Sequence, residues 1–324
     1  MSFRIQQIAS NIECMNPALD ETTDYIFNET EKFFSNPVNI LGERILDKLF
    51  SVIRHIGSGG MSDIYLVKDS NEKIYAAKFI KAEVVKNGRR KRFEREIRAL
   101  LRFQNHPYIL SAVTYGKFLD RPVIITEFAE GGSLYSRINL RNLSFYQALT
   151  YMAHACEGLH ELHKEGFIHR DVKPHNLLIV NNIGKLSDFG LIKELNVDVS
   201  SSFTGSIKGT VNYISPEMAN PSDKEIDWCT DIYSLGVTMF HVFCGRLPFL
   251  GNVFQIIKQH VDSSPPNPCD INKNIPKELS EIILRALSKA PEERPSALDI
   301  KDSVCRLAKV YGGVELENLF KHIY

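Results

Sequence analysis

The sequence has few of the features that would assign a chain to a specialised class at sight. Its 324 residues contain only six cysteines, none of them in a C-x-x-C pair, so neither a zinc ribbon nor a disulfide scaffold is indicated, and free thiols in a reducing compartment are expected. Its most apolar run, 232–244, is broken by polar residues and is too short to cross a bilayer. Lysine plus arginine and aspartate plus glutamate each total 39, so the chain has no net positive charge with which to neutralise nucleic-acid phosphates. These absences exclude the disulfide-rich, membrane-spanning and strongly basic classes.

The N-terminus also lacks the pattern of a Sec secretion signal. Residues 1–21 contain no basic stretch followed by an apolar core. We therefore predict a cytoplasmic protein with no nucleic-acid partner and no membrane insertion, although secretion by a non-Sec route stays open.

Composition and charge divide the chain into unequal segments. With 44% hydrophobic and 24% charged residues it can build a substantial core, and its length favours about two domains. Residues 1–40 carry six acids against two bases, a net charge of −4, so the remainder must carry +4 to reach the total of zero. The predicted units are an acidic N-terminal extension (1–45), a strand-rich lobe (46–128), a helical lobe (129–310) and a C-terminal tail (311–324).

Hydrophobic periodicity predicts strands first and helices later. The predicted strands are 50–56, 63–68, 73–80, 121–128, 177–180 and 185–187. The predicted helices are 88–103, one that follows a capping box at Ser144, 232–243 and 276–287. The chain therefore divides into a small sheet-rich half and a larger helical half, joined near 127–132.

A glycine-rich turn, Gly57-Ser-Gly-Gly-Met-Ser62, joins the first two predicted strands. Glycines allow the backbone to approach a phosphate closely and to offer it N–H donors. A motif this short fits equally well a glycine-rich hairpin with no ligand. It is not a dinucleotide-binding fingerprint, because a strand rather than a helix follows it.

Lys78 lies on the third predicted strand and could hold phosphates beneath that turn. Alone it would fit a solvated strand lysine. Glu96 falls on the apolar face of the predicted helix 88–103, where a carboxylate is costly unless it is paired. We therefore predict an ion pair between Lys78 and Glu96.

The segment 169–176, His-Arg-Asp-Val-Lys-Pro-His-Asn, concentrates charged and polar side chains after an apolar pair. Phosphoryl transfer needs a carboxylate near the acceptor hydroxyl, a cation near the γ-phosphate and oxygen ligands for Mg²⁺. Asp171, Lys173 and Asn176 match these three roles. Asp188, in Asp-Phe-Gly, would be the main metal ligand.

These blocks, in this order, resemble the eukaryotic-type (Hanks-type) protein kinases from about residue 50 to 307. Lys173 and Gly209-Thr210 resemble the serine/threonine branch of this family. The sequence of residues 236–249 resembles the bacterial members of that branch. The resemblance implies an α+β bilobal fold, ATP in the cleft between the lobes, Mg²⁺ (with Mn²⁺ as an alternative), protein substrates with serine or threonine acceptors, and Asp171 as the group that accepts the hydroxyl proton. The ATP-binding positions that it implies are Ile56, Gly57, Ser58, Gly59, Gly60, Ile64, Ala76, Lys78, Thr126, Glu127, Ala129 and Leu178.

The resemblance also implies features beyond the nucleotide site. Glu217 would pair with Arg294, and Asp231 would support the 169–176 loop. Arg170 would bind a phosphate on the segment 188–217, where Thr204 and Ser206 are the candidate autophosphorylation sites, with a homodimer as the form in which one copy modifies another. A merely polar loop is the alternative.

Three alternatives remain open at this point. The basic run 81–95 fits a solvated helix face, or a surface on which the acidic extension docks. The chain could be a nucleotide-binding scaffold without turnover, but the retained Asp171, Asn176 and Asp188 argue against this. It could also be a small-molecule phosphotransferase, but such an enzyme would lack the segment leading to Ser215-Pro-Glu217.

His160 and His163 do not have the spacing of a zinc motif and are predicted to be a helix-surface pair.

Overall fold

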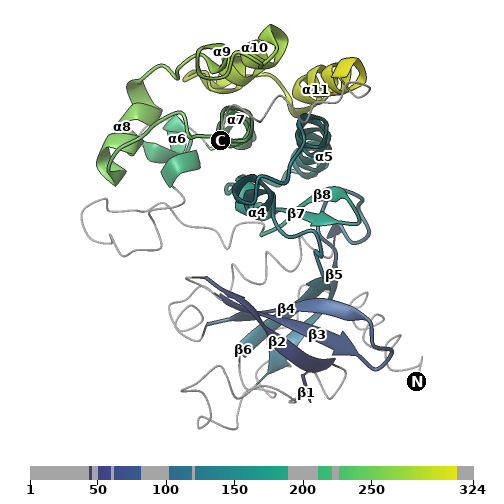
Figure 1. Ribbon diagram of the computed structural model, residues 1–324. Coiled ribbons are helices and arrows are strands. Elements are labelled where there is room, and N and C mark those ends of the chain that lie inside the picture. Colours follow the sequence, from purple (N-terminus) through teal and green to yellow (C-terminus); the bar gives the residue numbers. More distant parts are fainter. Residues whose placement is uncertain are drawn as a thin grey trace.

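The computed structural model describes residues 44–45, 50–59, 62–81, 102–118, 121–188, 211–220 and 226–311, and the statements below concern these residues. Six antiparallel strands form one sheet in the order β1-β2-β3-β4-β6-β5, so β6 lies between β4 and β5. The strands are β1 (Arg44–Ile45), β2 (Phe50–Ser58), β3 (Ser62–Asp69), β4 (Ile74–Ile80), β5 (Ala112–Phe118) and β6 (Arg121–Glu127). Figure 1 shows the sheet on one side of the molecule and the helices on the other.

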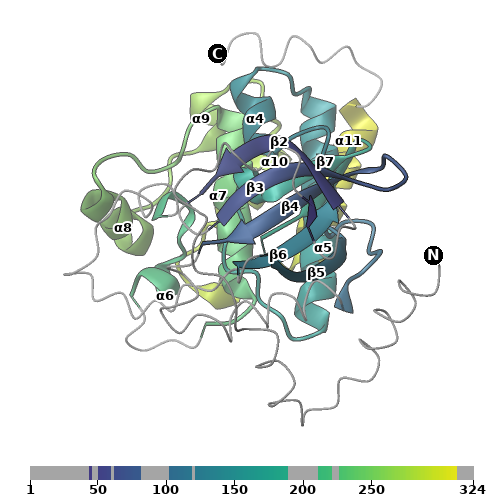
Figure 2. The same ribbon diagram turned by 90° about the horizontal axis from the view of Figure 1, so that it is seen from below.

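The sheet forms because successive side chains along each strand point to opposite faces, one of which is buried in an apolar core. One face buries a core of Phe50, Val52, Tyr65, Val67, Tyr75, Ala77, Phe79, Val123 and Ile125. The intervening side chains, such as Ile64, Ala76 and Lys78, are only partly buried and belong to the other face. The predicted strands 50–56, 63–68, 73–80 and 121–128 are confirmed, and Figure 2 shows the sheet in front of the helices.

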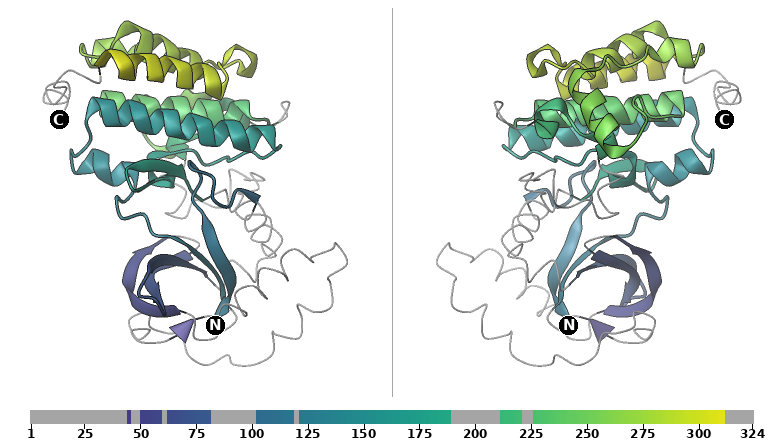
Figure 3. Two further views of the ribbon diagram at one scale, coloured as in Figure 1. Left: turned by 90° about the vertical axis from the view of Figure 1, so that its right-hand side faces the viewer. Right: turned by 90° about the vertical axis from the view of Figure 1, so that its left-hand side faces the viewer.

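The helical lobe has its own, larger core. Helix α7 (Cys229–Cys244) is buried along its whole length except at His241, which confirms the predicted buried helix 232–243. The other helices are α4 (Leu134–Asn139), α5 (Phe145–Lys164), α6 (Pro216–Ala219), α8 (Val253–Asp262), α9 (Pro268–Ile271), α10 (Lys277–Ala286) and α11 (Ala297–Tyr311), with short turns η4 (Pro174–Asn176), η5 (Val211–Tyr213) and η6 (Pro291–Glu293). Figure 3 shows α5 and α7 in one layer and α10 and α11 in a second layer farther from the sheet. Within the described ranges, no helix combines the length and apolarity needed to span a membrane.

Local signals fix several ends of these elements. At the start of α5, Ser144 accepts a bond from the Gln147 backbone and the Gln147 side chain accepts one from the Ser144 backbone, so the predicted capping box is confirmed. A second sheet pairs β7 (Leu177–Val180) with β8 (Ile183–Leu186). Its turn is shorter than the gap between the predicted strands 177–180 and 185–187, because Asn181 and Asn182 alone make it, with φ of 49° and 61°. The strand predicted at 185–187 therefore begins at Ile183.

Two segments next to the sheet are hydrogen-bonded to the β7–β8 sheet of the helical lobe. One follows β6, where the chain crosses to the helical lobe and Gly131 N donates to Ile179 O at 3.0 Å. The other precedes β5, where Leu110 N donates to Leu186 O at 2.8 Å and Leu186 N donates to Tyr108 O at 2.9 Å. The sheet is thus attached to the helical lobe by one chain crossing and by one non-covalent contact.

A buried histidine should make this fold sensitive to acid. His260 of α8 is fully buried, with its Nε2 atom 3.1 Å from the Asn212 carbonyl oxygen and its Nδ1 atom 3.1 Å from the Tyr233 hydroxyl. Burial and the nearby Lys289 ammonium lower the pKa of His260 from 6.5 to about 3. The unfolded state therefore binds a proton that the folded state does not, and the stability from neutral His260 is complete above pH 6.5 and is lost as pH falls toward 3.

We expect His260 to add about 1.4 kcal/mol per pH unit to the loss of unfolding free energy between pH 6 and about pH 4. Urea unfolding of the wild type and of His260→Gln at a series of pH values measures this contribution. An equal pH slope in the two proteins would contradict it.

Candidate active site

The strand register brings four predicted nucleotide-site residues onto one face of the sheet. Ile64 of β3 pairs with Lys78 of β4, and Ala76 of β4 pairs with Thr126 of β6. Residues that pair directly, or that lie two apart on one strand, point to the same face. Ile64, Ala76, Lys78 and Thr126 therefore share the face opposite the core of the sheet.

Two other predicted positions, Leu178 and Glu127, lie at or next to the segment that follows β6. Ile179 N donates to Gly132 O at 2.9 Å, and Ser133 forms an isolated bridge with Leu178, so β7 brings Leu178 beside 129–133. Glu127, at the end of β6, accepts bonds at Oε1 from Lys185 Nζ at 2.7 Å and from Ser111 N at 2.8 Å. The Glu127 side chain is thus occupied by structural partners, and its backbone N–H donates to Ser111 O at 3.1 Å, so its backbone carbonyl is the group that could accept a bond from a ligand.

Lys78 reaches across from the sheet to Asp188. Its Nζ lies 2.5 Å from Asp188 Oδ1, and the lysine side chain is largely buried. Burial raises the pKa of Asp188, but the Lys78 ammonium outweighs this effect and holds the pKa below its ordinary value. Asp188 is therefore ionised at neutral pH. The predicted partner Glu96 lies outside the described residues.

The loop before η4 orients one carboxylate. Lys173 Nζ lies 2.6 Å from Asp171 Oδ2, and Asn176 Nδ2 donates to the same oxygen at 2.9 Å and to the Asp171 carbonyl at 2.9 Å. The turn Pro174–Asn176 returns the chain so that Asn176 faces Asp171. Both contacts to the carboxylate use Oδ2, so its other oxygen, Oδ1, takes no part in them.

Asp231, in the first turn of α7, holds this loop from beneath, as the resemblance implied. It is fully buried and accepts the backbone N–H groups of His169 at 2.8 Å and Arg170 at 2.7 Å. Arg170 has a φ of 63°, a conformation that costs a non-glycine residue free energy and that these bonds stabilise. His169 Nε2 lies 3.0 Å from Ser187 O, which links the loop to the residue before Asp188.

His163 is a further member of this support that the sequence pattern did not reveal. Its Nε2 lies 2.8 Å from Asp231 Oδ2 and its side chain is mostly buried, so the prediction of a helix-surface pair is wrong for His163. Across the described portion of the chain, no group of three His, Cys, Asp or Glu side chains could hold a metal ion.

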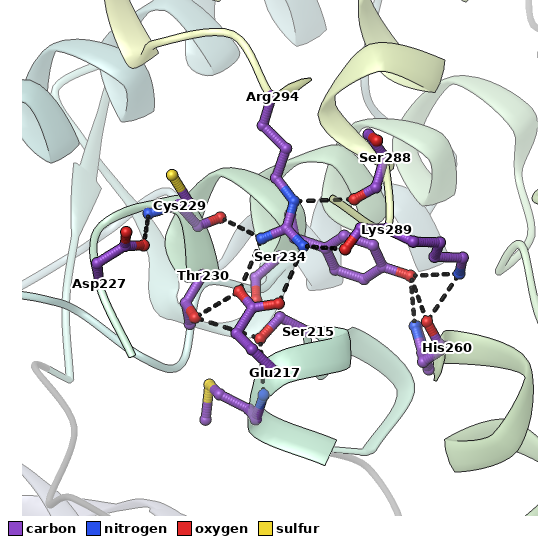
Figure 4. Close-up of polar contacts among 12 residues, drawn as sticks. Ser215, Glu217, Asp227, Cys229, Thr230, Ser234, His260, Ser288, Lys289 and Arg294 are labelled. Atoms are coloured by element: carbon purple, nitrogen blue, oxygen red, sulfur yellow. Dashed lines mark hydrogen bonds and ion pairs between the residues drawn. The ribbon is translucent and has the colours of Figure 1, made fainter. Parts of the chain in front are cut away.

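A buried ion pair anchors the far end of the segment that follows Asp188. Glu217 of α6 accepts bonds from Arg294 at 2.7 and 2.9 Å, and both side chains are almost entirely buried. Burial raises the pKa of Glu217, but the Arg294 guanidinium outweighs it and keeps the pKa below the ordinary value. The Thr230 hydroxyl adds a third bond to the carboxylate, and Figure 4 shows the cluster.

The site thus contains two charged clusters, Lys78 with Asp188 and Asp171 with Lys173 and Asn176. Ser187, next to Asp188, links them, because its N–H donates to Asn176 O at 2.8 Å. The family model for the protein kinase domain matches residues 50–304. The chain belongs to the protein kinase domain family. Membership implies ATP and a divalent cation as cofactors and confirms the predicted bilobal fold.

The relatives of this kinase domain place it among serine/threonine kinases. It is 33% identical over 279 residues to the serine/threonine-protein kinase pkn2 of Myxococcus xanthus, covering 80% of this chain and 32% of that protein. It is 32% identical over 263 residues to PrkC of Bacillus subtilis, covering 79% and 39%, and 32% identical over 248 residues to PknB of Mycobacterium leprae, covering 74% and 39%. By family it is a protein serine/threonine kinase domain, and it spans between about a third and two fifths of the length of these relatives.

The donor atoms of this kinase domain fit the cation that its family implies. Asp188 offers an ionised carboxylate, and Asn176 uses only its amide nitrogen in its bonds to Asp171, which leaves its amide oxygen outside them. Such oxygen atoms are the ligands that Mg²⁺ and Mn²⁺ prefer. Asp188 and Asn176 would therefore hold the ion.

Some predicted positions lie outside the described residues. These are Glu96, Gly60, Thr204 and Ser206. The acidic segment 1–40, most of the basic run 81–95 and most of the predicted helix 88–103 lie outside them as well.

Proposed function

We propose that this kinase domain transfers the γ-phosphate of ATP to serine or threonine hydroxyls of protein substrates. The observation that carries the proposal is the arrangement of Asp171, Lys173 and Asn176 on one loop, with Lys78 and Asp188 paired on the other side of the site. A bound divalent cation would supply charge neutralisation at the phosphates. Positioning and electrostatics account for most of the rate of such reactions.

In this mechanism each side chain has a separate task. Asp171, held at Oδ2, offers Oδ1 to the acceptor hydroxyl and takes its proton as the hydroxyl attacks. Lys173, which holds Asp171, brings positive charge to the transferred phosphoryl group. Lys78 fixes Asp188 and faces the nucleotide side of the sheet.

The adenine would lie against the face of the sheet that the register defines. Ile56, Ile64, Ala76 and Leu178 offer apolar contact, Thr126 lies at its inner edge, and the backbones of Glu127 and Ala129 offer hydrogen bonds. The glycine-rich turn, Gly57 to Gly60, would cover the phosphates.

Autophosphorylation at Thr204 and Ser206, a homodimer in which it occurs, and a cytoplasmic location are further proposals that rest on the sequence. The support for the first is Arg170, which stands beside Asp171 and is held by Asp231. A phosphate on the segment 188–217 would form charge-assisted bonds to its guanidinium.

Intact-mass measurement after incubation with Mg-ATP tests the activity, together with transfer of labelled phosphate to a generic basic protein. We expect the wild type to gain phosphoryl groups and to label the substrate. Asp188→Asn should abolish both, and Asp270→Asn, a change of the same kind at an exposed site on α9, should abolish neither. A wild type that gains no mass and labels no substrate would contradict the proposal, and peptide mapping of the modified chain would test Thr204 and Ser206.

A further inference from the structure

A second polar network lies at the turn end of β3, apart from the loop that carries Asp171. Asp63 at the start of β3 pairs with Arg121 at the start of β6 at 2.9 Å, and Arg121 Nε also donates to Ile80 O at 3.2 Å. Lys81, just after β4, lies 3.7 Å from Asp63. Three strands thus bring their charged ends together beside the glycine-rich turn.

Asp63 is a fixed, ionised group in this network. Its side chain is only 15% exposed and that of Arg121 16%. Burial raises the pKa of Asp63, but bonds from Arg121 and Ser58 and the charge of Lys81 outweigh burial and keep the pKa below its ordinary value. The carboxylate is therefore an anchor rather than a mobile surface charge.

The network is hydrogen-bonded to two successive residues of the glycine-rich turn, Ser58 and Gly59. Ser58 Oγ donates to Asp63 Oδ1 at 2.8 Å, and His55 Nε2 lies 3.0 Å from the same hydroxyl. Lys81 Nζ donates to Gly59 O at 2.7 Å. One bond comes from β3 and the other from the end of β4, so the turn is held from two sides.

Packing cannot supply this restraint. A Cβ atom at Gly57 would meet nothing within 4 Å, and one at Gly59 would meet only Ser62 O at 3.8 Å. Glycine also has more backbone freedom to lose than any other residue. Beyond the backbone bond inside the turn, from Gly59 N to Ser62 O at 2.8 Å, the bonds with Asp63 and Lys81 are therefore what can fix the conformation of its described residues before a ligand arrives.

We propose that Lys81 and Asp63 are positioning residues for the phosphates of the nucleotide: by fixing Gly59 and Ser58 they hold the glycine-rich turn in a phosphate-binding conformation. This rests on the proposed use of ATP. A turn that is already ordered loses less conformational entropy when its N–H groups bind phosphate, so the network increases affinity for the phosphates and not for the adenine. Neither residue contacts the reacting groups described above.

Calorimetric binding of a non-hydrolysable ATP analogue and of adenosine tests this on the whole chain. We expect Lys81→Met to raise Kd for the analogue about tenfold, which corresponds to about 1.4 kcal/mol, while Kd for adenosine changes less than twofold. Ser58→Ala, which removes the bond to Asp63 without changing charge, should raise Kd for the analogue about threefold. Lys81→Arg should keep most of the affinity, and Lys68→Met, at an exposed i,i+4 pair on the same sheet, should have no effect.

Two further measurements distinguish a positioning role of Lys81 from a general loss of structure in the variant. In nucleotide-free protein, the amides of Gly57, Ser58, Gly59 and Ser62 should exchange hydrogen faster in Lys81→Met than in wild type. The same variant should raise KM for ATP about tenfold with kcat changed less than threefold.

The proposal is overturned if Lys81→Met weakens the binding of adenosine and of the analogue equally or leaves both unchanged. It is overturned as well if hydrogen exchange at Gly57, Ser58, Gly59 and Ser62 is unchanged. It is also overturned if Ser58→Ala has no effect, since Lys81 would then act by its charge alone. A wild type that binds the analogue and transfers no phosphate contradicts the proposed function, whereas an active wild type with an unaffected Lys81→Met variant contradicts this inference.

Discussion

Asp171→Asn is expected to lower kcat for phosphoryl transfer by a factor of about 10² to 10⁴, the usual contribution of a positioned general base. Asparagine keeps the shape of the side chain and a contact with Lys173, but its amide cannot accept the acceptor's proton. Kd for ATP should stay within about threefold, because Asp171 contacts the acceptor side of the site. Initial rates with saturating substrate, together with calorimetric binding of ATP, measure the two effects separately.

Asp270→Asn is the matched control, because the Asp270 side chain is exposed and forms an i,i+3 pair with Lys273 far from the loop of Asp171 in the sequence. A kcat for Asp171→Asn within tenfold of wild type would contradict the assigned role. So would a loss of ATP binding that accounts for the whole decrease in rate.

The second large effect concerns stability. Glu217→Gln is expected to lower the free energy of unfolding by about 3–5 kcal/mol, because it leaves the Arg294 guanidinium buried without its counter-charge. Arg294 also donates to the carbonyls of Ser288 and Cys229, so it cannot easily move to solvent. Urea unfolding at pH 7 checks the value.

An exposed pair gives the comparison for this change. Glu278→Gln removes the partner of Arg306, where both side chains are well exposed, and should cost less than about 1 kcal/mol. The double variant Glu217→Gln, Arg294→Met should recover some of the loss, since it removes the unpaired charge as well. A loss below about 1 kcal/mol for Glu217→Gln, no larger than that of an exposed pair, would refute this account.

The sequence predicted best those features that depend on neighbouring residues. Alternation over 50–56 and 63–68 predicted β2 and β3, and the Ser144–Gln147 spacing predicted where α5 begins. The loop that holds Asp171 was also predictable, because Lys173 and Asn176 are only two and five residues away from it. In each case the chemistry lies within one turn or one strand of the chain.

The missed elements lack such local signals. β5 was not predicted, since Thr114, Gly116 and Lys117 interrupt its apolar pattern and it pairs only with β6, at the edge of the sheet. Helix α4 is only six residues long, too short to establish a period. The helices α8 and α11 were likewise not identified.

Contacts between distant residues were the least accessible to local patterns, and the pair Glu217 and Arg294, 77 residues apart, was predicted only through the family resemblance. Lys78 and Asp188 are 110 residues apart, and His163 and Asp231 are 68 apart. Local patterning put Lys78 on a strand and Asp188 after one, but only the folded chain brings their charges together. The network of Asp63, Arg121 and Lys81 likewise comes from three separate strands.

The two hydrogen-bonded segments between the lobes have a mechanical consequence. The crossing after β6 alone would allow one lobe to rotate freely about the chain, whereas the second contact, 108–110 against Leu186, restricts the rotation to an axis through both contacts. We expect rotation about that axis to open or close the proposed nucleotide site, and torsion across it to break bonds such as those of Leu186. Cutting the chain at one place, after Ala129 for example, would leave 106–111 on the fragment that lacks its β8 partner. The lobes are therefore expected to resist separate expression, and a split version of this domain would need its halves produced together.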